Sequence, residues 1–379
     1  MKVEVNPKML RWALERARMD PLALVKRFPK LEAWEDRTAQ PTLRQLEDFA
    51  RATRVPIGYL FLQQPPEEAV PIPDFRTRAD ARVRRPSPDL LETVYLCQQR
   101  QEWYRDFARS SAEEPLAFVG SLRVESDVVA AAASIRDALR FDLERRRTLP
   151  TWSEALREFI AAADAAGVLV MSSGIVGSNT HRKLDPVEFC GFAMADALAP
   201  VVFINGADSR SAQMFTLAHE LAHIWAGESA LSDAEVRTVP THRVERWCNQ
   251  VAAELLVPLE VLRQEIGAVG VRPDMNRLAR RFKVSTLVIL RRMYDARALT
   301  REAFWRAYDA ELERLRAMPA GTGGNFYLSV RARVSRRFAR ALVGSALEGQ
   351  TLYRDALRML GFSKMKTFDE LGRKLGVAA

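Results

Sequence analysis

The chain has 379 residues, which is too long for one ordinary hydrophobic core and predicts two or three domains. Its 48% hydrophobic and 28% charged residues are typical of a globular protein and exclude wholesale disorder. The net charge of +9 permits contact with nucleic acid, although the bias toward arginine explains part of it. Because the sequence has no long uninterrupted apolar stretch and no signal-peptide pattern at its start, we expect a cytoplasmic protein with no membrane partner.

The first half of the chain reads as mostly helical. Short helices are expected over residues 1–64, and a proline-rich linker follows at 65–75. Residues 87–148 are predicted to be helical. An amphipathic helix at 151–167 ends on a glycine, and a strand is predicted at 168–173.

The second half begins with two more strands. The segments 188–195 and 199–205 predict a hairpin or two neighbouring strands. Helices dominate from residue 210 onward: a helix-turn-helix pattern at 273–296 precedes one long helix at 301–317. A glycine-rich break leads to a helical module over about 327–377.

The few cysteines and histidines indicate which kind of metal site the chain can form. Cys97, Cys190 and Cys248 are far apart and form no CxxC pair, which excludes a cysteine-based zinc site and a disulfide framework. We expect them to be reduced and mostly buried. All four histidines lie between residues 181 and 242, and this concentration indicates a site.

The strongest motif is His219-Glu220-Leu-Ala-His223. On a helix, residues four apart share one face, so the two imidazoles can hold one Zn²⁺. Glu220 follows the first ligand and is placed to take a proton from a zinc-bound water. The helix is expected to stop at Gly227.

A catalytic zinc needs a third protein ligand. Ser229 stands where the HExxHxxGxxH pattern requires histidine, so that class is excluded. We choose Glu245, on the next helix and one turn before Asn249, with His242 as the competing ligand. The carboxylates that we weigh against it are Glu228, Glu235 and Glu254.

The segments around the motif allow more than one interpretation. The segment 199–205 is expected to be an edge strand beside the zinc, where a peptide substrate could bind by adding a strand. His181 lies in the preceding glycine-rich loop and could contact substrate. No rule selects an oxyanion donor among Tyr294, Tyr327 and Tyr353.

Three segments carry a family resemblance: GSNTHRKLDPVEFCGFA, FINGADSRSAQMFTLAHELAHIWAG and VERWCNQVAAELLVP. Together they resemble the ImmA/IrrE family of zinc metallopeptidases over about residues 150–300. The resemblance implies a small gluzincin-like α+β fold, zinc bound by His219, His223 and Glu245, and catalysis by Glu220. It also implies that the substrate is a specific protein, such as a DNA-binding repressor.

The N-terminal segment KLEAWEDRTAQPTLRQLEDFARATRVPIGYLFL resembles an Xre-type helix-turn-helix. The usual glycine after Trp34-Glu35 is missing, and the stretch before Trp34 is shortened where the groove-reading helix is expected. Lys30, Arg37 and Arg44 are the candidate phosphate contacts. A helical module that docks a protein is the alternative.

The combined expectation is a mostly α (α+β) protein acting as a zinc-dependent endopeptidase. Its expected domains are an Xre-like module at 1–66, a helical linker region at 67–148, the peptidase core at 149–300 and a C-terminal helical module at 301–379. The layout also resembles long members of bacterial toxin–antitoxin-like gene pairs. The alternative function is therefore a non-proteolytic antitoxin or regulator that binds a nuclease-like toxin and DNA.

Overall fold

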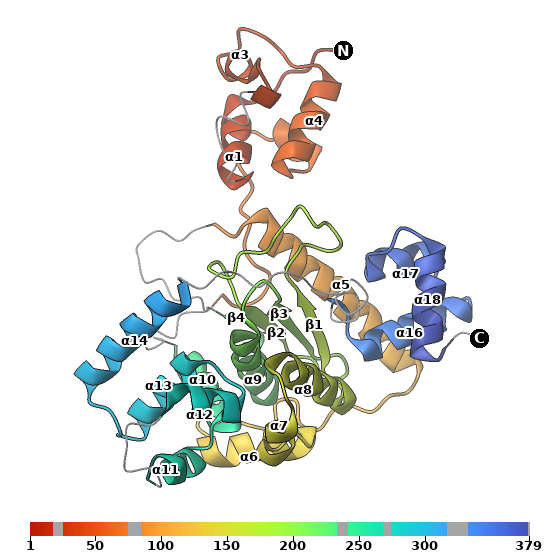
Figure 1. Cartoon of the computed structure of the whole chain (residues 1–379). Coiled ribbons are helices and arrows are strands. Elements are labelled where there is room, and N and C mark those ends of the chain that lie inside the picture. The colour runs from red at the N-terminus through yellow and green to blue at the C-terminus, as the bar shows by residue number, and fades with distance from the viewer. Residues whose placement is uncertain (18–25, 75–84, 233–241, 268–273, 317–332, 378–379) are drawn as a thin grey trace. The chain divides into compact units, whose positions relative to one another are not determined.

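The computed structural model describes residues 1–17, 26–74, 85–232, 242–267, 274–316 and 333–377. These residues fall into two compact units (Figure 1). The first comprises Met1–Pro71 and Asp80–Val94, and the second comprises Ile72–Ala79 and Tyr95–Ala379. The domain limits expected from the sequence stay predictions. Among the described residues, no helix is long and apolar enough to cross a membrane.

The first unit is a small helical bundle. Its elements are α1 (Pro7–Ala17), α3 (Leu31–Glu35), α4 (Leu43–Thr53), a 3₁₀ turn η1 (Ile57–Phe61) and the start of α5 (Pro88–Ser110). Its core gathers Met9, Trp12, Trp34, Phe49 and Leu60. The helix α4 begins with a reciprocal capping box between Thr42 and Gln45, as its sequence predicts.

The second unit holds one small sheet and most of the helices. Its strands are β1 (Leu169–Ser173), β2 (Gly191–Met194), β3 (Val201–Asn205) and β4 (Ala230–Ser232). Its helices after α5 are α6 (Val128–Leu139), α7 (Leu143–Thr148), α8 (Trp152–Ala166), α9 (Arg210–Ala226), α10 (Arg243–Leu256), α11 (Leu259–Gly267), α12 (Met275–Phe282), α13 (Thr286–Asp295), α14 (Arg301–Arg316), α16 (Arg336–Leu347), α17 (Tyr353–Leu360) and α18 (Met365–Leu375). The α+β fold class is thereby confirmed.

The strand order is β1-β3-β2-β4. The strands β1 and β3 are parallel, whereas β2 runs antiparallel to both β3 and β4. The expectation of neighbouring strands at 188–195 and 199–205 is confirmed. The expectation that 199–205 forms an edge is wrong, because β3 lies between β1 and β2 and its hydrogen bonds are used on both sides.

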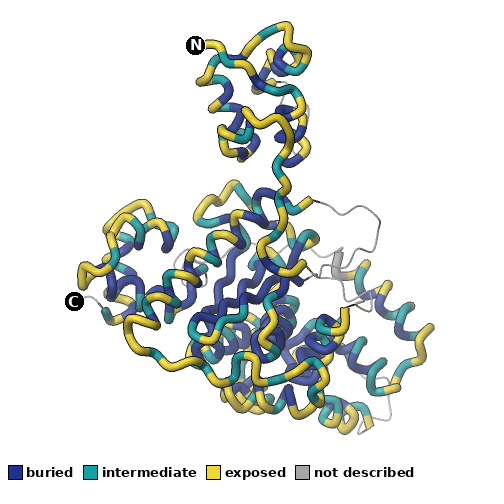
Figure 2. Tube along the Cα trace, turned by 180° about the vertical axis from the view of Figure 1, so that it is seen from behind, coloured by how far each residue is buried: buried dark blue, intermediate teal, exposed yellow. Residues whose placement is uncertain are grey.

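Both faces of the sheet are covered, so every strand residue is buried (Figure 2). Val170 and Val202 point into the core formed with α8 and α9. On the other face, Met171 contacts Cys97 and Arg100 of α5. This alternation follows from the two-residue repeat of a strand. It explains why these segments read as continuous apolar runs.

The last three helices, which we call the C-terminal module (residues 334–377), are tied to the rest of the second unit by buried polar contacts. The guanidinium of Arg100 donates to the carbonyl of Met359 at 2.9 Å. The carboxylate of Asp164, on α8, accepts from the Ser335 hydroxyl and, at 2.9 Å, from the Arg337 amide. Asp164 thus satisfies an otherwise unpaired N–H at the start of α16.

A first prediction concerns this junction. Replacing Asp164 with alanine should lower the free energy of unfolding by about 1–3 kcal/mol, because it leaves buried donors at the start of α16 without a partner. Urea unfolding measures this loss, and hydrogen exchange should speed up in the first turn of α16. The matched control is Asp137→Ala, an exposed site on α6. Equal stability of the two variants would contradict the capping role.

Candidate metal centre

The helix α9 presents the motif as its sequence predicts. Its N-cap is Ser209, whose hydroxyl accepts from the Ala212 amide, and it ends at Gly227, which has a φ of +74°. His219, Glu220 and His223 are all buried on it. The residues between 210 and 226 contain neither glycine nor proline, so the two rings keep their one-turn spacing.

The third member comes from α10, which packs along α9 and α6. Trp247 anchors α10 by donating from its indole nitrogen to the carbonyl of Ser126 at 2.9 Å. Glu245 lies in the first turn and is buried. The crossing of the two helices therefore brings Glu245 against the motif.

The three side chains converge closely enough to share one ion. His219 Nε2 lies 3.1 Å from His223 Nε2. The Glu245 oxygens lie 3.2 Å from His219 Nε2 and 3.0 Å from His223 Nε2. Ligand bonds of 2.0–2.1 Å at tetrahedral angles place ligand atoms about 3.3–3.4 Å apart. The observed triangle is close to that geometry, and these residues form a group that could hold a metal ion.

Several polar atoms around this triangle have no well-formed hydrogen bond in the described structure. They are both oxygens of Glu220, the Ser232 hydroxyl beside that carboxylate, and Nδ1 of both histidines. Buried polar groups are normally paired, since an unpaired one costs about 1–3 kcal/mol. So many at one place indicate a site built for a polar ligand, and two imidazoles with one carboxylate are a zinc donor set. The residues present therefore fit a zinc ion.

Charge and burial act together on the protonation of these groups. Burial raises the pKa of Glu220 to about 8, and the charge of Glu245 adds to this effect. Burial also acts to raise the pKa of Glu245, but the adjacent His219 and His223 hold it below its ordinary value. Glu245 is thus anionic, as a metal ligand must be.

The other candidate ligands lie elsewhere. Glu254 is buried but pairs with Arg292 and accepts from the Leu259 amide, so it stabilises the start of α11. Glu228 is exposed after the end of α9, and His242 is an exposed residue preceding α10. Glu235 lies outside the described residues.

The remaining sequence candidates do not join this group. His181 is exposed in its loop. Tyr294 stacks on Phe304, and Tyr353 packs against Phe368 in the C-terminal module. Tyr327 lies outside the described residues, so no oxyanion donor is assigned.

The strand β2 contributes a residue that the sequence analysis missed. A Cβ built on Gly191 would lie 2.6 Å from Thr216 Cγ2, 2.7 Å from the Phe203 carbonyl oxygen and 3.2 Å from Glu220 Oε1. Only glycine lets β2 approach α9 this closely, directly beside the Glu220 carboxylate. An isolated glycine within a predicted strand is a known signal of such an approach, and it was available in the sequence.

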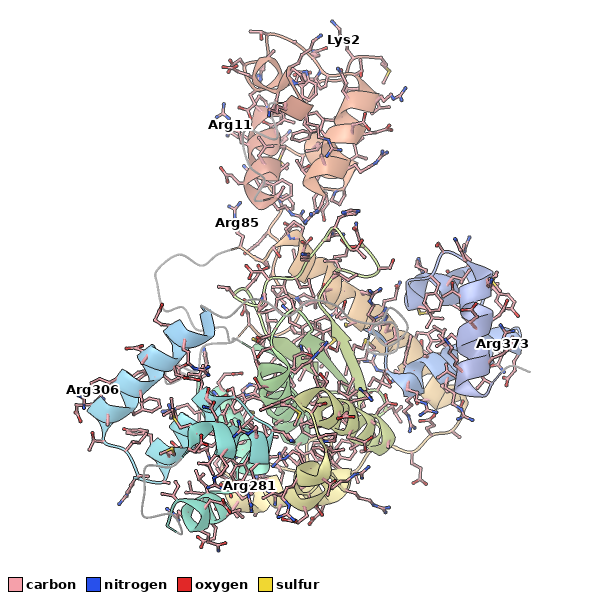
Figure 3. The ribbon with its side chains drawn as sticks, in the orientation of Figure 1. Lys2, Arg11, Arg85, Arg281, Arg306 and Arg373 are labelled. Carbon is pink, nitrogen blue, oxygen red and sulfur yellow. The ribbon has the colours of Figure 1, made fainter. Side chains whose placement is uncertain are left out.

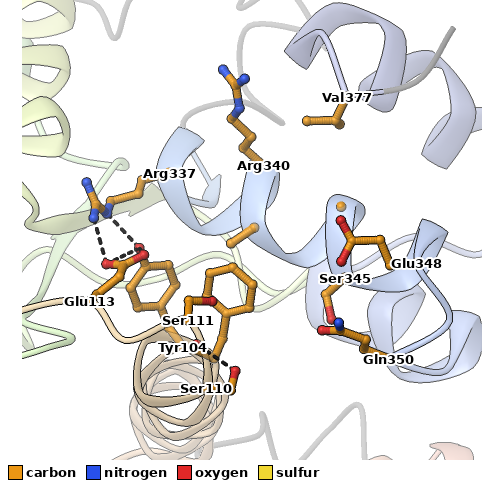
Figure 4. A pocket seen from close by; sticks show the side chains of 13 residues that line it. Tyr104, Ser110, Ser111, Glu113, Arg337, Arg340, Ser345, Glu348, Gln350 and Val377 are labelled. Carbon is orange, nitrogen blue, oxygen red and sulfur yellow. Dashed lines mark hydrogen bonds and ion pairs between the residues drawn. The ribbon is translucent and has the colours of Figure 1, made fainter.

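A cleft that none of the metal-centre residues lines is shown in Figure 4. It has a volume of about 630 Å³ and runs between the end of α5 and the helix α16. Its polar wall is internally bonded: Arg337 donates to Glu113 at 2.8 Å and to the Tyr104 hydroxyl at 2.6 Å. These contacts join the C-terminal module to α5.

The fold and the site together define an α+β domain with a His-Glu-x-x-His metal centre. Residues 163–294 match the family model described as the IrrE N-terminal-like domain, a peptidase family. Residues 334–374 match a domain of unknown function (DUF8813). Searches of curated proteins and of solved structures gave no match. The matched segment contains His219, Glu220, His223 and Glu245, and it supports a zinc metallopeptidase of the ImmA/IrrE type.

A second prediction separates the two buried glutamates of α10. Glu245→Ala should lower the zinc content of the purified protein at least tenfold, because it removes one of three ligands. Glu254→Ala should keep its zinc but lose about 1–3 kcal/mol of stability, because buried Arg292 loses its ion pair with Glu254 and keeps only the Val257 carbonyl and Asp295. Elemental analysis and urea unfolding measure the two effects. Equal zinc loss in both variants, or loss only with His242→Ala, would overturn the assignment.

A third prediction tests the close approach at Gly191. Gly191→Ala should lower the free energy of unfolding by about 1–3 kcal/mol, because the methyl group overlaps Thr216 and the β3 backbone. The control is Gly344→Ala in α16, where nothing lies within 4 Å of the new Cβ and helix propensity favours alanine. Thermal unfolding distinguishes the two. Equal changes would show that β2 can move aside.

Proposed function

We propose that this protein is a zinc-dependent endopeptidase that cleaves a specific protein partner. The observation that carries the proposal is the Glu220 carboxylate. It is fully buried, has no well-formed hydrogen bond beyond its contact with the Ser232 hydroxyl, and lies next in sequence to His219, one of the three converging side chains. A structural carboxylate in such a place would be paired with a cation, so this arrangement favours a role in proton transfer.

The chemistry divides among four side chains. His219, His223 and Glu245 would hold the metal, which when bound supplies Lewis acidity toward a peptide carbonyl and a water molecule. Glu220 accepts the proton of the attacking water on one oxygen and donates it to the leaving amine nitrogen. The buried surroundings exclude bulk water from this exchange.

Restricted access supports a specific substrate. Glu220 and His223 expose no surface, and His219 is only 5% exposed. The outer edge of β4, where a peptide could add a strand, is partly bonded to the chain itself: the Leu231 amide donates to the Pro73 carbonyl at 2.9 Å. An unfolded peptide meets an edge that is already partly bonded there, so we infer that a partner must engage this surface first.

The regulatory setting is also a proposal. A repressor or a nuclease-like toxin fits as the partner, and a non-proteolytic antitoxin or regulator is the rival function. In the first unit, the exposed side chains Lys30, Arg37 and Arg44 surround a helix, α3, of only five residues. So short a helix offers few residues for base readout. We therefore favour protein docking, with at most weak DNA contact, for this unit.

A fourth prediction tests proteolysis directly. Glu220→Gln should retain zinc but cut the cleavage rate about 10²–10⁴-fold, because the proton acceptor is removed while the ligands remain. The variant is first used to capture the partner. Purified wild type and variant are then incubated with that partner, and mass spectrometry detects new termini. The matched control is Glu228→Gln, an exposed glutamate just after α9.

The outcomes distinguish the peptidase from the non-proteolytic regulator. Cleavage by wild type and Glu228→Gln, but not by Glu220→Gln, supports the peptidase. If all three proteins relieve or bind the partner alike and produce no new termini, the rival regulator function stands. Rapid hydrolysis of unfolded casein by the wild type would contradict the specific-substrate proposal.

A further inference from the structure

The C-terminal module contains a second helix-turn-helix that the metal centre does not use. The helices α17 and α18 are joined by four residues, 361–364, and Gly361 at the end of α17 has a φ of +72°. A turn of three or four residues with a glycine is characteristic of helix-turn-helix units. The helix α16 packs on both α17 and α18 and completes a three-helix core through Phe338, Met359 and Phe368.

Exposure of the second helix distinguishes this unit from the one at α12 and α13. The helix α13 is largely buried, and it packs against α11, α12 and α14. In contrast, α18 packs mainly on α16 through Phe368, Leu371 and Leu375. Its opposite face is exposed and carries Lys364, Met365, Lys366, Asp369 and Arg373. Within the part of the chain that the structure describes, one face of α18 is open to a groove, whereas α13 is enclosed.

The charge of the module is far more positive than that of the rest of the chain. Residues 334–377 contain nine Lys and Arg against four Asp and Glu, so they carry +5 of the total net charge of +9. Arg354 and Arg358 share Asp355, and Arg337 is bonded to Glu113. The remaining exposed cations include Lys364, which precedes α18, and Lys366 and Arg373 on it (Figure 3 labels Arg373). This face suits a polyanion.

The spacing of these cations favours duplex DNA over an acidic protein. Lys366 and Arg373 are seven residues apart on one helical face, which corresponds to about 10 Å along the axis. A helix lies lengthwise in the major groove, so cations spaced along its axis can reach phosphates that border the groove. On the same exposed face, Met365 and Asp369 can meet base edges, where a carboxylate can accept from the amino group of cytosine.

We propose that the C-terminal module binds duplex DNA with α18 in the major groove. This site is separate from the metal centre and from the candidate phosphate contacts of the first unit. Its phosphate contacts come from Lys364, Lys366 and Arg373. The binding does not depend on zinc or on proteolysis, so it can be measured without a substrate.

The test uses the full chain and a fluorescent 30-base-pair duplex of mixed sequence. Lys364, Lys366 and Arg373 are changed together to glutamate, and anisotropy gives the dissociation constant at several salt concentrations. Affinity should fall at least tenfold. The slope of log affinity against log salt should drop by about 2–3, because each lost phosphate contact contributes about 0.9. The charge-matched control changes Arg123, Arg301 and Arg306, which are exposed outside the module, to glutamate.

Four results would overturn the proposal. Equal weakening in the control would mean that only net charge matters. No weakening in the α18 variant would exclude α18. Loss of binding confined to a variant with Lys30, Arg37 and Arg44 changed to glutamate would place DNA on the first unit. Binding of polyglutamate as tightly as of the duplex would identify an acidic protein as the ligand. Circular dichroism of each variant verifies that it is folded.

Discussion

His219, His223 and Glu245 meet in a buried position, and the architecture of the second unit is organised around that contact. An anionic carboxylate and two imidazoles inside a protein are costly unless a ligand compensates for the lost hydration. A bound metal ion would provide that compensation and would couple metal binding to the folding of this region. The crossing of α9 and α10 has to be precise, and Trp247 and the α9 caps maintain it.

Close packing around Glu220 follows from the same constraint. The carboxylate is fully buried. The absence of a side chain at Gly191 allows β2 to cover it. Across β2 and β4, Ser232 is paired with Gly191 and brings its hydroxyl beside that carboxylate. The sheet thus forms one wall of the site, with β1 and β4 as its edges.

The C-terminal module is attached to this core by polar groups that the core buries. Arg100, Asp164 and Arg337 each join it to α5 or α8. Its exposed face carries Lys and Arg side chains that take no part in these contacts. The chain therefore combines a buried group of candidate metal ligands with an exposed basic helix. The buried group suits a small metal ion and the basic helix suits a polyanion. Mutations can therefore affect one feature without the other.

Local patterns in the sequence were sufficient for the motif helix, its end at Gly227 and the pairing of β2 with β3. These depend on spacing, capping and turns within a few residues. Glu245 could also be chosen over His242, which shares its helix face, because His242 stands at the expected start of that helix. The position of β3 inside the sheet and the pairing of Glu254 with Arg292 could not be predicted in this way. The sequence also could not predict that α18 is exposed whereas α13 is buried. Each of these depends on which distant segments pack together, and that is decided only when the whole chain has folded.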